Sequence, residues 1–205
     1  MTDTRRSRAH QSLRDATAAA HHALDHHPLL QRLIGSDLTR ELYAESLAAM
    51  YRPHARLERL VHQSRHCSES GLGLSARLAL LEADLVELGW PAPPVPDVAP
   101  DALRGRAAWL GRVYVLEGSR LGGAFIARRV QSSLGPSVPC RFLCAPMGPD
   151  DRNALLAMLE RALEAPAELE RAIAGARAAF ADYKDDLDGF DRGRRKMEWC
   201  REACG

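Results

Sequence analysis

The sequence has few aromatic residues and no long apolar run. Aromatic side chains make up only 5% of its 205 residues, whereas alanine and leucine are plentiful, which favours helices over a β-sandwich. No stretch approaches the roughly 18 consecutive apolar residues of a membrane span. Residues 1–11 are polar and lack the apolar segment of a secretory signal. We therefore expect a cytoplasmic protein with no membrane span.

The chain also lacks an excess of charge of one sign. Its 28 Lys and Arg residues and 27 Asp and Glu residues leave a formal net charge of +1. This balance gives no bulk attraction to nucleic acid or to an anionic membrane, so we expect no nucleic-acid partner. An anionic ligand would need a local basic cluster.

Cysteine is scarce, and its spacing is not that of a disulfide framework or a zinc site. The five cysteines are Cys67, Cys140, Cys144, Cys200 and Cys204. Their number is odd and no Cys-x-x-Cys pair occurs, which argues against a disulfide scaffold or a zinc ribbon. We interpret them as free thiols in a reducing compartment.

What the sequence does contain is helical periodicity, interrupted by Pro and Gly. The predicted helices are residues 7–34 with a possible break at Pro28, 38–66 with a possible kink at Pro53, 74–88, 101–134, 150–163 and 166–190. Asp37 and Asp101 are the predicted caps, and residues 68–73, 89–100 and 135–149 the predicted turns and loops. These elements predict an all-α, multihelical single domain over residues 1–190, followed by a basic, weakly ordered tail at 191–205.

The first helix carries two histidine pairs. At 100° per residue, His21 lies beside the apolar stripe that runs from Leu13 to Leu24, and His22 lies on the opposite side. His21 can therefore face an interior, either as a hydrogen-bonded core residue, which this helix alone favours, or as a metal ligand. His22 and His26 share the polar face, where they could bind a surface metal ion.

The second helix has apolar residues at alternating spacings of four and three. This core stripe consists of Tyr43, Leu47, Met50, His54, Leu57 and Val61. We predict that His54 is a packed polar residue and that His62 and His66 are solvated. No Glu-x-x-His pair occurs, which argues against a carboxylate-bridged di-iron bundle.

The fourth helix is unusual because its apolar stripe continues through glycine. The stripe comprises Leu103, Ala107, Leu110, Tyr114, Gly118, Gly122 and Phe125, with Gly123 beside it. Each glycine in a helix interior costs about 1 kcal/mol relative to alanine. Close helix packing and a flat ligand on the helix backbone explain the glycines equally well. With an interior histidine on another helix, the pattern suggests a planar metal macrocycle, because histidine is the usual axial ligand of haem iron.

Two segments resemble the motifs of a known family. Residues 13–21, LRDATAAAH, resemble the proximal-helix motif of haem oxygenases, and residues 114–123, YVLEGSRLGG, are similar to their distal-helix motif in its bacterial form. The second helix adds similarity at Tyr43, Leu47, Tyr51, Leu57 and Glu58. The resemblance covers about residues 10–190.

The resemblance implies an all-helical fold with haem between the first and fourth helices. The implied reaction opens haem to biliverdin, iron and carbon monoxide, using O2 and electrons from a separate reductase or ferredoxin. His21 would be the neutral proximal ligand, Gly118 and Gly122 would border the site where O2 reacts, and Thr17 and Phe125 would contact haem. Some bacterial relatives supply biliverdin to a bacteriophytochrome, so such a protein is an expected acceptor.

The distal motif departs from much of the family at one position. Many members carry an aspartate directly after the first distal glycine, where it organises water for proton delivery. This chain has Ser119 there. Either Ser119 holds a water molecule or the network is anchored elsewhere, so Ser119 joins the catalytic candidates.

Haem carries two propionates, so basic residues should mark the edge of its site. The resemblance assigns this role to Arg14, seven residues before His21, and in a rotated seating to Arg128. The Arg14 seating implies cleavage at the α-meso carbon, giving biliverdin IXα. Three alternatives stay open: a haem carrier or sensor of the same fold, a non-haem member of the helical superfamily, and a plain interaction bundle. Addition of hemin separates the last two from a haem protein.

Overall fold

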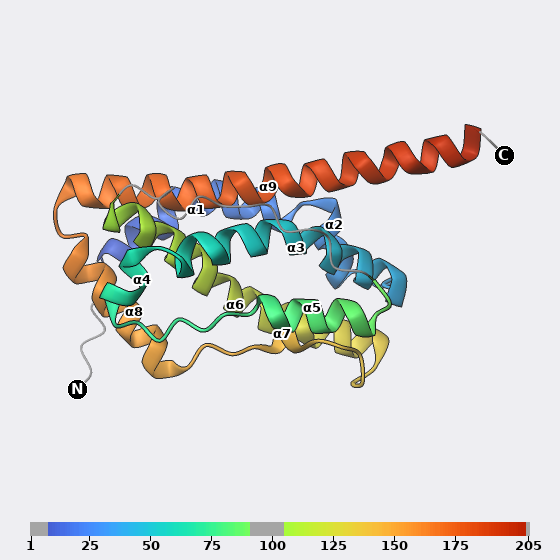
Figure 1. The fold of residues 1–205 in the computed structure, drawn as a ribbon, viewed down its shortest axis with the longest axis horizontal. Coiled ribbons are helices and arrows are strands. Elements are labelled where there is room, and N and C mark those ends of the chain that lie inside the picture. Colours follow the sequence, from blue (N-terminus) through green and yellow to red (C-terminus); the bar gives the residue numbers. More distant parts are fainter. Residues whose placement is uncertain (1–7, 91–104, 204–205) are drawn as a thin grey trace.

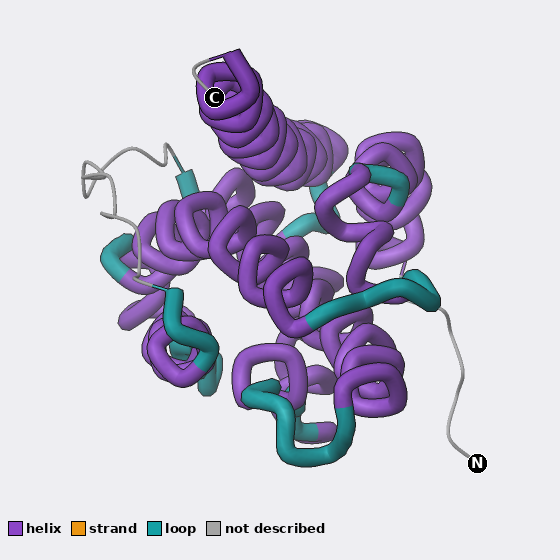
Figure 2. Tube along the Cα trace, turned by 90° about the vertical axis from the view of Figure 1, so that its right-hand side faces the viewer, coloured by secondary structure: helices purple, strands orange, loops and turns teal. Residues whose placement is uncertain are grey.

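The computed structural model describes residues 8–90 and 105–203, and all of their regular structure is helical (Figure 1). The helices are α1 (Arg8–Asp25), α2 (Pro28–Gln31), η1 (Arg32–Ile34), α3 (Arg40–His62), α4 (Arg65–Ser70), α5 (Leu78–Glu87), α6 (Arg106–Leu134), α7 (Arg141–Cys144), α8 (Pro149–Ala162) and α9 (Pro166–Ala203). The tube in Figure 2 shows no strand in this part of the chain, which confirms the predicted all-α class. None of the helices described is both long and apolar enough for a bilayer crossing.

The N-terminal helices differ from the prediction at their caps. The predicted break at Pro28 is confirmed, because α1 ends at Asp25 and Pro28 starts α2. The predicted cap Asp37 is wrong. The Thr39 hydroxyl accepts a hydrogen bond from the Leu42 amide at 3.2 Å and caps α3 instead.

Boundaries further along the chain also shift. Ser64 caps the short helix α4, so residues 65–70 are helical where a solvated helix end and a turn were expected. The helix expected at residues 74–88 begins only at Leu78. Residues 135–149, expected to be irregular, contain the short helix α7. The predicted cap Asp101 lies outside the described residues, and α6 starts at Arg106 after Gly105.

Helix α9 is longer than predicted. It passes Phe190 without a break and continues to Ala203, so the predicted helix end at about residue 190 is wrong. Figure 1 shows α9 along one side of the bundle, with its C-terminal end extending beyond the other helices. The first turn past Phe190 still contacts the bundle, because Arg194 lies 2.9 Å from Glu45 of α3.

Glycine allows α6 and α9 to cross at very short range. A Cβ atom on Gly111 would stand 1.9 Å from the Ala172 carbonyl oxygen, and one on Gly175 would stand 2.2 Å from that of Ala108. Real Cβ atoms do not approach backbone oxygen so closely. Beside this crossing Trp109 is fully buried and donates its indole N–H to the Val61 carbonyl at 3.0 Å. The crossing fixes the first half of α6 in the core.

The predicted core stripe of α3 is confirmed. Every member is buried except the half-buried Met50, and His54 is 2% exposed with its ring edge-on to Phe142. The prediction that His66 is solvated is wrong. It is 8% exposed, because the turn at Ser64 brings its ring to 6.2 Å from that of Trp109.

Candidate active site

Helix α6 changes its surroundings at Gly118. Before this point the stripe is buried at Ala107 and Leu110 and half-buried at Tyr114. From this point on Gly118 and Gly122 are exposed, and Leu121 and Phe125 leave 58% and 48% of their surface to solvent. Large apolar side chains gathered on one open helix face mark a binding surface more often than a solvated one.

The glycines of this face have space in front of them. A Cβ atom on Gly118 or on Gly122 would meet nothing within 4 Å outside its own helix segment. A Cβ atom on Gly123 would lie 3.1 Å from the Leu143 carbonyl oxygen. Close packing therefore explains Gly123 but neither of the other two. The flat-ligand interpretation accounts for both.

The ring of His21 is oriented by a carboxylate, as the rings of metal-binding histidines usually are. Its side chain is 63% exposed, and its Nδ1 lies 2.7 Å from an Asp25 carboxylate oxygen. The carboxylate fixes the tautomer with the proton on Nδ1, which leaves the lone pair of Nε2 free for a metal. The ring also rests edge-on against Phe180, with 5.8 Å between centroids. The core interpretation of this histidine does not apply.

The two neighbouring histidines, His22 in α1 and His26 just after it, are arranged differently. His22 and His26 stack with 3.9 Å between ring centroids, and His26 Nδ1 lies 2.9 Å from the His22 carbonyl. Within residues 8–90 and 105–203, no group of three or more His, Cys, Asp or Glu residues is placed to hold a metal ion. Compared with His22 and His26, His21 combines an anchored ring with the apolar side of the helix.

Helices α1 and α6 contact each other at Tyr114 of α6. The rings of His10 and Tyr114 lie 5.8 Å apart. Burial raises the pKa of the Tyr114 hydroxyl, while its hydrogen bond with Thr17 and the charge of Arg14 act against this shift. Gly118 follows Tyr114 by four residues, and His21 follows Thr17 by four residues, so each lies one helical turn beyond the Thr17–Tyr114 contact. In Figure 1 α1 follows α9, whereas α6 slants away from both toward α7, so the two helices diverge beyond their contact.

The remaining predicted binding residues have different environments. Thr17 is 2% exposed and donates its hydroxyl hydrogen to the Leu13 carbonyl at 2.7 Å, so its polar group already has partners inside the protein. Arg14 is exposed beside the His10–Tyr114 contact. Arg128 is exposed on the second half of α6 and donates to the Ala124 carbonyl at 3.2 Å. The structure therefore places the two candidate propionate cations on different helices.

Ser119 is tied to a residue that sequence reasoning missed. Its hydroxyl donates to the Leu116 carbonyl at 2.6 Å and accepts from Arg77 Nη2 at 2.7 Å. Arg77 is 2% exposed and also donates to the Leu116 carbonyl at 3.1 Å. Burial and the charge of Arg120 lower the pKa of Arg77 to about 10, so it stays charged at neutral pH.

Arg77 is itself anchored from α3. Its backbone amide donates to a Glu58 carboxylate oxygen at 2.6 Å, and the Leu78 amide donates to the other at 3.0 Å. His54 Nε2 lies 3.1 Å from the same carboxylate. Burial raises the pKa of Glu58, but the hydrogen bonds from His54 and from the two amides outweigh it and hold the pKa at about 2. Glu58 thus caps α5 in place of a local side chain.

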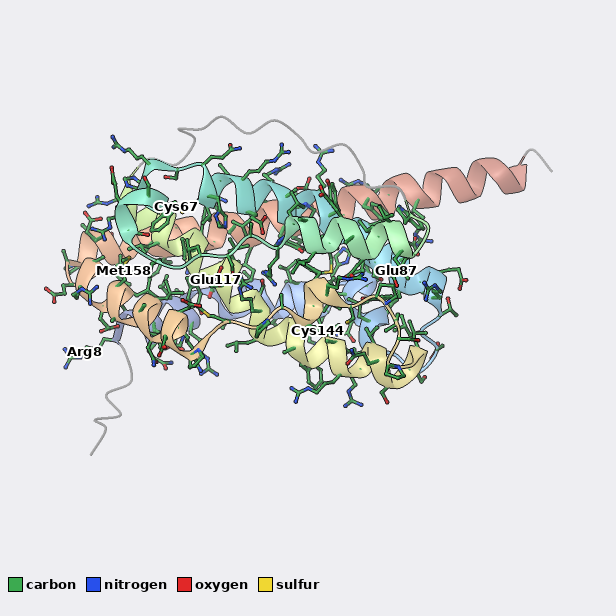
Figure 3. All side chains as sticks on the ribbon, turned by 60° about the horizontal axis from the view of Figure 1, so that its bottom comes forward. Arg8, Cys67, Glu87, Glu117, Cys144 and Met158 are labelled. Atoms are coloured by element: carbon green, nitrogen blue, oxygen red, sulfur yellow. The ribbon has the colours of Figure 1, made fainter. Side chains whose placement is uncertain are left out.

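A second buried ion pair lies on the same stretch of α6. Glu117 and Arg120 are each 3% exposed and 2.6 Å apart, and Arg120 also donates to the Ser75 carbonyl at 2.6 Å. Figure 3 shows Glu117 in the middle of the bundle, far from Met158 and Glu87 near its ends. The segment around Gly118 is therefore apolar and open on one face, and lined by hydrogen-bonded charged groups on the other.

These residues fit a haem group. Gly118, Gly122 and Phe125 provide a flat apolar face on α6, and His21 provides an oriented nitrogen donor on the neighbouring helix. An iron porphyrin needs both features, an apolar surface for its ring and an axial ligand for its metal.

Comparison with known proteins agrees with this geometry. No family model matches the chain. The chain is 35% identical over 148 residues to the heme oxygenase of Xanthomonas campestris pv. campestris, covering 68% of this chain and 87% of the relative. Heme oxygenase PigA of Pseudomonas aeruginosa is 31% identical over 170 residues, covering 79% and 85%.

Two solved structures share the fold. The NO- and CO-bound heme oxygenase of Neisseria meningitidis aligns with a TM-score of 0.69 at 26% identity, covering 89% of this chain and 91% of that one. The heme oxygenase of Leptospira interrogans aligns with a TM-score of 0.63 at 17% identity, covering 87% and 98%. Both relatives are more than 30% identical and are covered over 87% and 85% of their length, so the chain belongs to the haem oxygenase family.

Proposed function

We propose that this protein opens haem oxidatively to biliverdin, with release of iron and carbon monoxide, at a site between α1 and the second half of α6. The observation that carries the proposal is the pairing of His21, anchored by Asp25, with glycines that face open space one turn beyond the α1–α6 contact. When bound, haem supplies both the iron that activates O2 and the ring that is cleaved.

The residues of the chain prepare this site. His21 Nε2 binds the metal, and Asp25 keeps its ring in one tautomer and orientation. Gly118 and Gly122 leave room beside the ring because no side chain projects there. Leu121 and Phe125 cover apolar ligand surface and exclude water. Ser119 holds a hydroxyl at the edge of the same face.

We propose that Arg14 seats the propionates. It lies on α1 with His21, and its charge acts with burial and with Arg152 to lower the pKa of His10, against the charge of Glu160. A charge-assisted hydrogen bond contributes about 1.5–3 kcal/mol, enough to favour one seating about tenfold or more. The Arg14 seating corresponds to cleavage at the α-meso carbon, and an Arg128 seating to the β or δ carbon.

Electrons must come from another protein or a small reductant. The sequence contains neither a Gly-x-Gly-x-x-Gly nucleotide motif nor a ferredoxin cysteine set, so we propose a separate reductase or ferredoxin. We place the reaction in the cytoplasm, where the thiols of Cys67, Cys140 and Cys144 would stay free. A bacteriophytochrome that takes up biliverdin is the proposed acceptor.

A hemin titration tests the site. We expect wild-type protein to give a sharp Soret band and, with a reductant, biliverdin and carbon monoxide. His21→Ala should keep the fold but lose the axial ligand and turnover, whereas His22→Ala should behave as wild type. A normal spectrum in His21→Ala together with its loss in His22→Ala would reverse the assignment. A haem spectrum without product would identify a carrier.

The propionate assignment has its own test. Chromatography of the biliverdin from wild type, Arg14→Ala and Arg128→Ala identifies the cleaved carbon. We expect mainly the α isomer from wild type and a mixture from Arg14→Ala. A wild-type product of the β or δ isomer, shifting to α in Arg128→Ala, would show that Arg128 is the controlling cation.

A further inference from the structure

Helix α7 carries a cysteine at each of its ends. Cys140 is the residue before the helix and Cys144 is its last residue, and the Cys144 amide donates to the Cys140 carbonyl at 2.9 Å, which closes one helical turn between them. Both are free thiols, Cys140 with 4% of its surface exposed and Cys144 open to solvent. An accessible thiol beside a buried one can be oxidised first and then be attacked by its neighbour.

The backbone of this turn is held by two other helices. The Tyr43 hydroxyl of α3 donates to the Pro139 carbonyl at 2.8 Å, directly before Cys140. Asp84 of α5 is fully buried and accepts from the Phe142 amide at 2.9 Å. The two thiols are therefore carried by one short segment whose position is fixed.

The separation of the two cysteines suits a disulfide after a small movement. Four residues along an α-helix rise about 6 Å, within the roughly 4.4–6.8 Å that disulfide-bonded Cα atoms span. Cβ atoms at this spacing lie about 5–6 Å apart, whereas a disulfide brings them to about 3.5–4.5 Å. Burial raises the pKa of the Cys140 thiol, and the neighbouring Cys144 thiol raises it further against the effect of Tyr43, so the two side chains already interact. Closing the bond would contract the turn by roughly 1–2 Å, and a strained disulfide of this kind is readily reduced again.

Contraction of α7 would reach α6 at Gly123. The carbonyl oxygen of Leu143, inside the turn, stands 3.1 Å from the position of a Cβ atom on Gly123, and Leu143 is 2% exposed. Close-packed contacts of this kind transmit a displacement because they contain no free space. Gln131, further along α6, lies 3.8 Å from the Cys144 sulfur. A change in the shape of α7 is therefore felt in the second half of α6.

We propose that Cys140 and Cys144 form a reversible thiol–disulfide site, oxidised by hydrogen peroxide, whose disulfide form loosens the packing of α7 on α6. The Cys144 thiolate attacks a peroxide oxygen, so an S–O bond forms, the O–O bond breaks, and the departing hydroxide takes up a proton. The Cys140 sulfur then attacks that of Cys144, which forms the S–S bond, breaks the S–O bond and releases a second water. In sum the thiols lose two hydrogen atoms and the peroxide becomes two water molecules. The site goes beyond the proposed function and does not depend on it.

The test uses the tryptic cleavage site at Arg141, which lies between the two cysteines. Trypsin separates residues 130–141, with Cys140, from residues 142–152, with Cys144, so a disulfide joins two peptides that are otherwise apart. Haem-free protein is treated with hydrogen peroxide, alkylated at its remaining thiols, digested without reductant and analysed by mass spectrometry. We expect the joined peptides in protein that stays monomeric on a non-reducing gel, and their separation by reductant. Absence of the joined peptides would overturn the site.

The second readout is amide hydrogen exchange of residues 120–126 of α6, again in haem-free protein. We expect oxidation to speed this exchange roughly tenfold, the effect of losing about one hydrogen bond, and reductant to restore it. Equal exchange in the oxidised and reduced proteins would overturn the proposed loosening of α6.

Two variants serve as matched controls. Cys144→Ser removes the exposed thiol without touching the core and should show neither the joined peptides nor faster exchange. It keeps Met147, so faster exchange that persists in this variant would come from methionine oxidation and would overturn the proposal. Cys67→Ser removes a thiol outside α7 and should behave as wild type. Links made by Cys200 or Cys204 join other peptides and are told apart by mass. Failure of hemin binding would count against the proposed function alone, since both readouts use haem-free protein.

Discussion

The two halves of α6 use glycine for opposite purposes. In the first half Gly111 lets the backbone of α9 approach so closely that a Cβ atom would stand 1.9 Å from the Ala172 oxygen. In the second half Gly118 and Gly122 have nothing within 4 Å of the same position. The lack of a side chain at Gly111 lets α9 approach, whereas the lack of side chains at Gly118 and Gly122 leaves the helix surface open. What lies opposite each glycine distinguishes a packing contact from a binding face.

The largest effect should follow from Gly111→Ala. The new methyl group would overlap a backbone oxygen, which cannot rotate away as a flexible side chain can. Overpacking of this kind costs about 3 kcal/mol or more. Urea denaturation should show this loss in the free energy of unfolding, with Gly118→Ala as the matched control. Equal stability of the two variants would remove the distinction between the halves of α6.

A somewhat smaller effect on the free energy of unfolding is expected at Glu58, which anchors Arg77 against the second half of α6. The folded-state pKa of about 2 lies below the ordinary 4.5, so the carboxylate stabilises the fold at neutral pH. Glu58→Gln should lower the free energy of unfolding by roughly 2–3 kcal/mol at pH 7. The contribution is complete above pH 4.5 and disappears as the pH falls through about 2, so the two proteins should converge in acid. Glu168→Gln, at an exposed pair, is the control. A difference between Glu58→Gln and wild type that does not depend on pH would contradict the assignment.

Asp25 should have a moderate effect on binding and little on folding. It is 56% exposed, and its role is to orient His21. Loss of such a partner typically weakens metal affinity about 10- to 100-fold. We expect Asp25→Ala to weaken haem binding within this range in a hemin titration, with an unchanged unfolding curve. Affinity equal to that of wild type would show that the carboxylate does not support the ligand.

Much of the fold follows from periodicity, but several boundaries do not. The apolar stripes of α1, α3 and α6 predict which faces are buried. Residues 74–77 stay out of α5 because Glu58, twenty residues earlier, binds the first amides of the helix at Arg77 and Leu78. A carboxylate that caps a distant helix leaves no local signal. In the same way, nothing near His66 indicates that it packs against Trp109.

The site was partly visible in the sequence. His21, Gly118 and Gly122 stand out because a histidine beside an apolar stripe and glycines within one are unusual. Arg77 does not, since an arginine at the start of an amphipathic helix is ordinarily a surface charge. Gly111 was missed because a single glycine has meaning only opposite Ala172, on a helix sixty residues away. Residues that interrupt a helical pattern can be found in the sequence, whereas the roles of Arg77 and Gly111 depend on residues that only the fold places beside them.

The most direct test of the account is Gly118→Leu. Leucine is a better helix former than glycine, and the space in front of Gly118 is open, so the haem-free variant should keep its helicity and unfold at the same or a higher urea concentration. Its side chain should nevertheless occupy the face where haem lies and block turnover. The measurement is biliverdin formation at matched circular dichroism. Loss of product in a fully folded protein is the predicted result, and native-like turnover would contradict the claim that the second half of α6 is the distal face of the haem site.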